Sequence, residues 1–231
     1  MTWAVKKVLV GILACFLAGG TAGATVSVSP VVLDAVQVEV GQVFQIFCQN
    51  WGEEEITMDL TLALFDQDES GSVIFLEDAQ GRARAKKTLN VDVETLSIEP
   101  NGRDVIQVEL LQDDFDHLYA VLFIKPRQGG IQTRFAVLFL LSTAGSEGAD
   151  MTVLALDKQH ESLTFTVQNN GLRHGPWQGE LHFFDVADQL NEKRQISSGL
   201  ILAGRRRGVQ VSLPPWVHRV EVRSSWPEQT R

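Results

Sequence analysis

The chain has 231 residues, of which 44% are hydrophobic and 21% charged, and its formal net charge is −9. This composition is that of a globular protein and excludes a disordered or collagen-like chain. The acidic excess also argues against nucleic acid as a partner, because binding to phosphates depends on a basic surface.

The first 24 residues have the three parts of a secretory signal peptide. Lys6 and Lys7 precede an apolar run at 8–18, and Ala22-Gly23-Ala24 is a small-residue cleavage site. The run is too short to anchor the chain across a bilayer, which takes about 20 residues, and no later segment is a candidate. We therefore expect a periplasmic or secreted protein with no membrane span and, once Lys6 and Lys7 are removed, a net charge of −11.

The sequence has two cysteines, Cys15 within the predicted signal and Cys48. Lipidation at Cys15 is an alternative to simple cleavage, although Leu13 fits a lipidation site poorly. Cys48 shares an alternating face with Phe44 and Ile46, and no basic residue flanks it. We expect an inert thiol in the core that faces Val121 and forms no internal disulfide.

Two segments repeat one pattern at a spacing of 119 residues. Gln49-Asn50-Trp51-Gly52 is followed by Leu64-Phe65-Asp66, as Gln168-Asn169-Asn170-Gly171 is by Phe183-Phe184-Asp185. A second repeat links Gly102-Arg103 with Gly204-Arg205 at a spacing of 102, so the second copy is shorter by about 17 residues. The pattern indicates a tandem duplication, which informs the fold more than the function.

Apolar and polar residues alternate with period two in both copies, and turn residues separate the alternating segments. No segment of sufficient length shows a helical period. The expected strands lie at 36–40, 44–48, 56–64, 89–93, 118–124 and 135–141 in the first copy, and at 153–156, 163–167, 181–184, 196–202, 209–213 and 217–222 in the second.

Many short strands with regular turns predict an all-β protein of two tandem immunoglobulin-like β-sandwich domains after a cleaved signal peptide. The predicted divisions are a signal at 1–24, a first domain at 25–143, a linker at 144–150, a second domain at 151–224 and a tail at 225–231.

The segment Asp66-x-Asp68-x-Ser70-Gly71 with Glu77 has the spacing of an EF-hand calcium loop. Residues 59–64 alternate as a strand, however, and the second copy lacks the motif. We therefore expect an acidic hairpin turn, with calcium binding as the alternative. No catalytic residue, metal site or cofactor is predicted, because the histidines lack ligand spacing and no serine or cysteine lies in a nucleophile motif.

Short motifs of the first domain resemble those of PapD-like periplasmic chaperones. They are Ser29-Pro30, Val38-x-Val40-Gly41-Gln42, Gln49-Asn50-x-Gly52, Ile98-x-Pro100-x-Gly102 and Leu118-Tyr119-Ala120-Val121-Leu122. The resemblance implies partner binding by β-strand pairing, with Phe135, Val137, Phe139 and Leu141 as the alternating residues of the donated strand. The alternative is that this strand fills the core of its own domain.

The same resemblance implies a pair of cations that hold the terminal carboxylate of the partner. Lys125 and Arg127 are candidates for one of them, but residues 29–33 contain no arginine for the other. The sequence thus predicts a divergent, non-enzymatic binding protein, a chaperone or accessory factor whose partner is another exported protein such as a pilus or surface-structure subunit. A structural spacer of the cell surface is the alternative.

Overall fold

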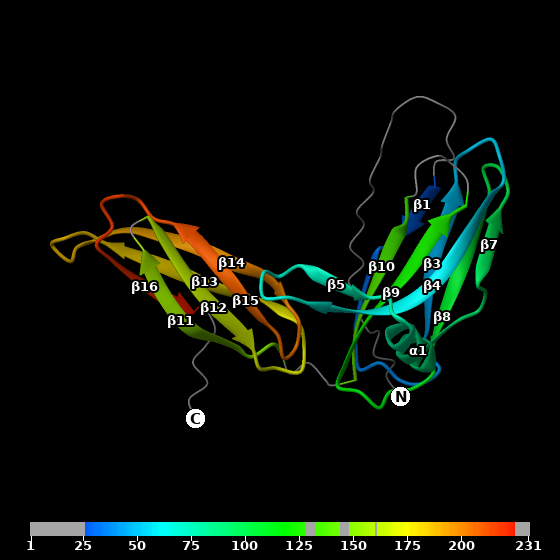
Figure 1. Cartoon of the computed structure of the whole chain (residues 1–231), viewed down its shortest axis with the longest axis horizontal. Helices are drawn as coiled ribbons and strands as arrows, with labels where there is room; N and C mark the ends of the chain where they lie inside the picture. Colours follow the sequence, from blue (N-terminus) through cyan, green and yellow to red (C-terminus); the bar gives the residue numbers. More distant parts are fainter. Residues whose placement is uncertain (1–25, 128–132, 144–147, 160, 225–231) are drawn as a thin grey trace, which may run out of the picture. The chain divides into compact units, whose positions relative to one another are not determined.

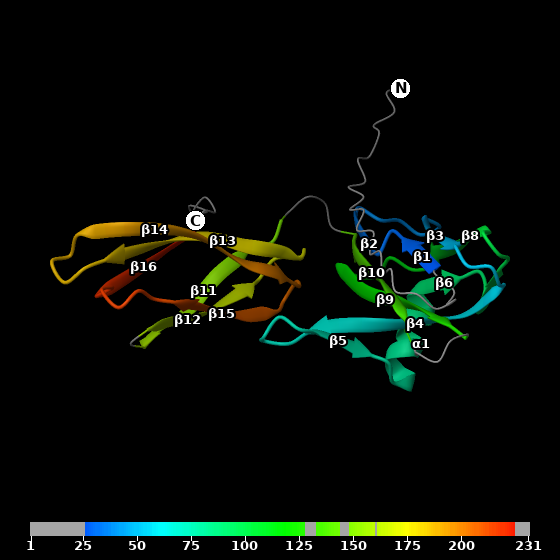
Figure 2. The same ribbon diagram turned by 90° about the horizontal axis from the view of Figure 1, so that it is seen from above.

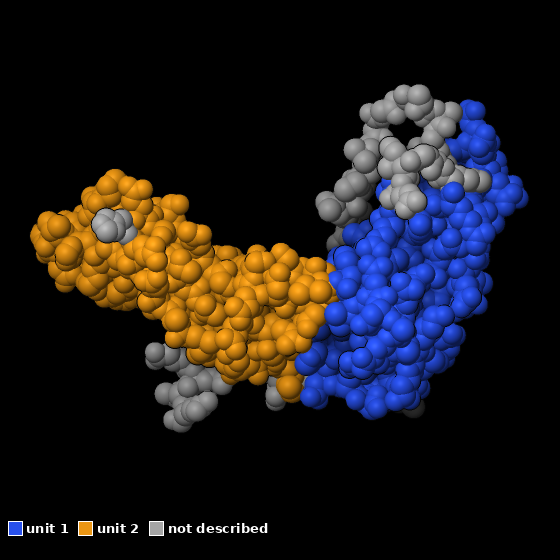
Figure 3. Space-filling view, in the orientation of Figure 1, with its two compact units in different colours: residues 1–65, 75–145 blue, residues 66–74, 146–231 orange. Residues whose placement is uncertain are grey.

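The computed structural model describes residues 26–127, 133–143, 148–159 and 161–224. The chain forms two compact units, residues 1–65 with 75–145 and residues 66–74 with 146–231 (Figure 3). Both units are built from paired β-sheets, which confirms the predicted class of two immunoglobulin-like sandwiches. The domain boundaries remain predictions, and the predicted signal at 1–24 and tail at 225–231 lie outside the described residues.

Unit 1 is a sandwich of two sheets (Figures 1 and 2). The order in one sheet is β1 (Val26–Ser29), β3 (Val43–Asn50), β8 (Arg103–Leu110) and β6 (Leu89–Val91). In the other it is β2 (Val32–Val36), β10 (Phe135–Ser142), β9 (His117–Pro126), β4 (Ile56–Gln67) and β5 (Val73–Leu76), with β7 (Thr95–Ile98) also paired to β4. β2 and β10 run parallel.

The period-two pattern places the apolar residues of unit 1 between its sheets. In β3, Phe44, Ile46 and Cys48 are buried and alternate with exposed residues. In β9, the core residues are Leu118, Ala120, Leu122 and Ile124. Val121 therefore lies on the other face of β9 from Ala120 and Leu122, and the prediction that it faces Cys48 was wrong. A shift of one residue in a strand exchanges its two faces.

One helix, α1 (Ala79–Thr88), was missed by the sequence analysis. The Asp78 side chain caps its first turn by accepting the Gly81 N–H at 2.6 Å, and Lys86 and Lys87 lie in its last turn. These features favour a helix through capping and charge, although the segment has no apolar face for a periodicity search to find.

Unit 2 has two three-stranded sheets. One has the order β11 (Met151–Gln159), β12 (Ser162–Asn169) and β15 (Arg206–Ser212), and the other β14 (Leu190–Ile201), β13 (Gly175–Phe184) and β16 (Arg219–Ser224). The Phe165 ring meets the Trp177 ring edge-on at 5.4 Å in the core between them. Each of the six strands expected from the second copy is present.

The repeated asparagine forms the same hydrogen bonds in both units. The Nδ2 atom of Asn50 donates to the carbonyls of Glu54 (2.7 Å) and Ile98 (3.1 Å), and its Oδ1 accepts the Gly52 N–H at 2.9 Å. The equivalent bonds of Asn169 go to Arg173, Ile201 and Gly171, at 2.7, 3.0 and 3.0 Å. Both asparagines are fully buried. These three bonds correspond in the two units, as expected of a duplication.

We predict that Asn169→Ala destabilises unit 2 by about 2–4 kcal/mol, because the buried carbonyl of Ile201 and the Gly171 N–H lose their partner. Asn170→Ala is the matched control, since the Asn170 side chain makes one exposed bond to Thr152 Oγ1 and its loss should cost less than about 1 kcal/mol. Urea unfolding followed by circular dichroism measures both. Equal losses for the two variants would contradict this role of Asn169.

We also predict that Cys48 resists thiol reagents in the native protein. Its burial and, secondarily, the Asp104 carboxylate raise the pKa of the thiol to about 12, so the reactive thiolate is scarce at neutral pH. Reaction with a chromogenic disulfide should be slow until guanidinium unfolds the chain, with Cys15→Ser as the background for the assay. Rapid labelling of native protein would show that the core around β3 opens.

Candidate functional site

A cleft of about 680 Å³ lies on unit 1 beside α1, β4 and β9. Its lining combines an apolar floor with many charged side chains, namely Asp59, Leu60, Thr61, Glu77, Arg82, Lys86, Glu94, Thr95, Phe123, Lys125, Arg127 and Arg134. Five of these residues are cationic and three are anionic, so the lining is positive in a protein whose net charge is negative. A local field of this sign attracts acidic groups.

Arg134 forms one wall of the cleft. Its Nη1 and Nη2 atoms donate to the two carboxylate oxygens of Glu77 at 2.7 and 2.8 Å. The guanidinium also lies 4.0 Å from the centre of the Phe123 ring, which meets Phe75 edge-on at 5.0 Å. The hydrogen bond from Arg134 lowers the pKa of Glu77. A bidentate pair stacked on an aromatic ring holds this wall in one geometry.

A second ion pair belongs to the lining of the cleft. Arg127 donates from Nε and Nη2 to one oxygen of Asp59, at 2.9 and 2.6 Å, and this bond lowers the pKa of Asp59. Lys86 pairs with Glu94 at 3.0 Å. With all three lining carboxylates engaged, Arg82 and Lys125 have no ion-pair partner among the described residues. These two cations are the candidates for contact with an anionic group.

The structure brings Lys125 and Arg127, both predicted from the sequence, into the lining of this one cleft. Lys125 lies directly across from Asp59 in the β4–β9 register, so their side chains share a face. Arg82, Lys86 and Arg134 were not predicted from the sequence. Arg82 and Lys86 are four residues apart on α1, so recognition of the helix would have placed them on one face.

The other predicted residues belong to β10, which lies between β2 and β9. Val137, Phe139 and Leu141 are buried in the core of unit 1, and Phe135 packs against the same core. The Phe139 ring meets Phe44 edge-on at 5.8 Å. In the chain without a partner, this face of β10 therefore lies in the core of unit 1. That the strand fills the core of its own domain is the alternative that the sequence left open.

Among the described residues, β10 has a free edge at its start. The β2 strand pairs with residues 138–142, and the Leu138 N–H donates to the Val31 carbonyl at 2.9 Å. Because alternate residues of a strand direct their N–H groups to the same side, the Ala136 N–H also points to this side, beyond the end of β2. No described strand pairs with 135–137 there.

The carboxylates of the calcium-like motif are engaged in other contacts. Asp68 accepts the N–H groups of Ser70 and Ser72, both at 2.9 Å, as in an acidic turn. Glu77 is held by Arg134, and within unit 2 Arg205 donates two hydrogen bonds to the carboxylate of Asp66. The described residues contain no group of three or more metal-ligating side chains, and no helix among them is long and apolar enough to span a membrane.

Comparison with known proteins finds solved structures with a similar fold. No protein-family model and no curated protein matches the sequence. The solved class 5 fimbriae chaperone CfaA is 8% identical, with a TM-score of 0.58 over 88% of this chain and 100% of that chain. A chain from the chaperone–tip adhesin complex of CFA/I fimbriae is 7% identical, with a TM-score of 0.57 over 86% and 98%.

A third match comes from the CsuC–CsuE chaperone–tip subunit complex of Acinetobacter baumannii, with 11% identity and a TM-score of 0.50 over 80% of this chain and 89% of that chain. The chain has the fold of PapD-like fimbrial chaperones. The likeness that the sequence motifs indicated for the first domain thus extends over both domains.

We predict that Phe139→Asp destabilises unit 1 by more than about 4 kcal/mol, because the variant buries an unpaired carboxylate. Phe47→Asp is the control, since Phe47 is 54% exposed on the outer side of β3 and its replacement should change stability by less than about 1 kcal/mol. Urea unfolding measures both. A folded Phe139→Asp variant would show that this face is accessible to a partner.

Proposed function

We propose that this protein is an exported, non-enzymatic chaperone that binds a subunit of a fimbria-like surface structure in the periplasm. The observation that carries the proposal is the likeness to fimbrial chaperones along nearly the whole of both chains. Two features of unit 1 support it, the free edge at the start of β10 and the positively charged cleft beside β9.

The free edge offers the backbone groups that strand pairing needs. An extended segment of the subunit pairs with residues 135–137 in line with β2, and the Ala136 N–H donates to it. Backbone pairing gives affinity with little dependence on sequence, which suits a chaperone. The core face of β10 stays covered by unit 1 in this arrangement, so binding requires no opening of the sandwich.

The cleft adds charge recognition. Arg82 and Lys125 bind an acidic group of the subunit, while the pairs Arg127–Asp59 and Arg134–Glu77 keep the walls in place. Arg134 immediately precedes β10, so the cleft and the free edge adjoin along the chain. Recognition by two cations in a shaped cleft is stronger than contact with scattered surface charges.

The proposal is tested by affinity capture from an exported fraction. The wild type should return one partner in about a 1:1 ratio, and the double variant Arg82→Glu with Lys125→Glu should weaken capture about tenfold or more without a change in melting temperature. The control Arg84→Glu with Lys87→Glu has the same change in net charge on exposed α1 positions outside the cleft lining, and should bind as the wild type does.

Failure of the wild type to capture any stoichiometric partner would overturn the proposal and favour a structural spacer. If the double variant Arg82→Glu with Lys125→Glu captures the partner as well as the wild type does, the binding surface lies outside the cleft. Equal weakening by the two double variants would indicate nonspecific attraction to the acidic partner rather than a defined site.

A further inference from the structure

In the part of unit 2 that the structure describes, the sandwich is closed on one side and open on the other. On the closed side β14 adjoins β15, and Arg194 Nη1 donates to the Ser212 carbonyl at 3.2 Å. The opposite side is bounded by β11 and β16, the outer strands of their sheets. There Lys158 Nζ donates to the His218 carbonyl at 2.7 Å, just before β16 begins.

The apolar interior is partly uncovered along this open side. Leu156 of β11 lies directly across from the buried Phe165, so its side chain belongs to the inner face, yet it is 55% exposed. Val220 and Val222 of β16 pair with the core residues Phe183 and Leu181 but are only half-buried. No described strand pairs with β16 on the side away from β13. An additional strand at this edge would cover the exposed apolar side chains.

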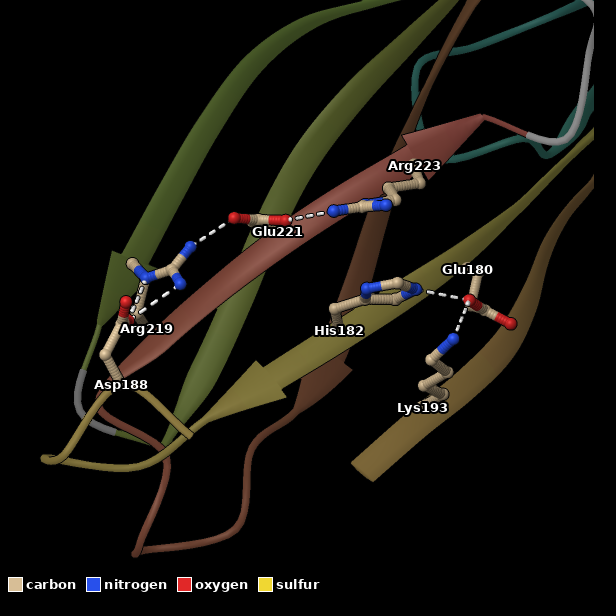
Figure 4. A network of polar contacts seen from close by, with 7 residues as sticks. All are labelled: Glu180, His182, Asp188, Lys193, Arg219, Glu221 and Arg223. Atoms are coloured by element: carbon tan, nitrogen blue, oxygen red, sulfur yellow. Dashed lines mark hydrogen bonds and ion pairs between the residues drawn. The ribbon is translucent and has the colours of Figure 1, made fainter. Parts of the chain in front are cut away.

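The outer face of β16 carries alternating charges that specify what such a strand must look like. Figure 4 shows Arg219, Glu221 and Arg223 in a row along the strand. The Glu221 carboxylate accepts from Arg219 and, at 3.0 Å, from Arg223, while Asp188 holds Arg219 at 2.7 Å. Edge charges of this kind repel most strands, so a partner must present the complementary order of charges.

The neighbouring charges on this face are already balanced within the sheet. His182 and Lys193 contact Glu180, and the hydrogen bond from His182 lowers the pKa of that carboxyl group (Figure 4). Because β16 is the outer strand of its sheet, Arg219, Glu221 and Arg223 are the charged residues that adjoin the uncovered edge.

We infer that β16 pairs with β16 of a second copy of this chain, antiparallel and centred on Val222. In this register Glu221 of each copy lies opposite Arg223 of the other, so both cross-copy contacts join opposite charges. Val222 lies opposite its counterpart on the inner face, over the uncovered apolar side chains. Centring on Glu221 instead would set Glu221 opposite Glu221 and Arg219 opposite Arg223, which are like charges.

The resulting dimer has a two-fold interface, in which the same edge serves both copies and the two three-stranded sheets join into one. It uses unit 2, whereas the proposed subunit-binding site lies on unit 1. The inference therefore stands independently of the proposed function.

Charge exchange at the edge tests the register. Sedimentation equilibrium should show a dimer of the wild type at about 0.1 mM. Glu221→Arg and Arg223→Glu, each alone, should raise the dissociation constant about tenfold or more, because each variant sets like charges opposite one another at both contacts. The double variant Glu221→Arg with Arg223→Glu should restore the dimer, as should a mixture of the two single variants.

Lys193→Glu is the matched control, since it has the same change in net charge as Arg223→Glu but lies on β14, the other edge of the sheet. It should leave the dimer intact. Melting temperatures check that each variant is folded. A monomeric wild type, a dimer insensitive to both single variants, or a dimer lost in the single variants and restored neither in the double variant nor in the mixture would overturn the inference.

Discussion

The two sandwiches depend on one buried side-chain amide each. Asn50 ends β3 in one sheet and donates to the carbonyl of Ile98, at the end of β7 in the other sheet. Asn169 ends β12 and donates to Ile201, at the end of β14 across the second sandwich. An apolar side chain at either position would leave several buried backbone groups unpaired, which costs more than its better packing returns. Each amide thus fixes where two sheets meet and how the chain turns between them.

Much of this architecture is encoded in local patterns. The 119-residue repeat predicted two related sandwiches because its asparagine and glycine form the same turn twice. Alternation predicted β3, because the buried Phe44, Ile46 and Cys48 are separated by outward positions that include Gln45, but of the strand expected at 36–40 only Val36 lies in a strand. Helix α1 was missed because Asp78 and its arginines and lysines stabilise it by capping and charge, which leave no apolar period.

The limits of the pattern are clearest in the strands that are apolar on both faces. In β9 and β10 alternation cannot distinguish the core face, so the phase was wrong by one residue at Val121 and left open at Phe139. The cleft shows the same division. Lys125 and Arg127 were named because the resemblance to PapD-like chaperones implies a cation near the end of this strand, whereas Arg134 is brought to them by the pairing of β10 with β9.

The ion pairs of the cleft explain how an acidic protein can present a positively charged site. Asp59, Glu77 and Glu94 each pair with a cation, whereas Arg82 and Lys125 form no ion pair among the described residues. Exposed pairs contribute little to stability, so their value here is geometric. The negative net charge of the chain as a whole disfavours nonspecific anionic partners.

The proposed pairing of a partner with the free edge of β10 can be followed by amide hydrogen exchange in the free protein and in its complex with the captured partner. This pairing should leave the Ala136 amide rapidly exchanging in the free protein and strongly protected in the complex, while the outer face of β3 is unchanged. An Ala136 amide that exchanges equally fast in both states, with new protection confined to another part of the chain, would contradict it.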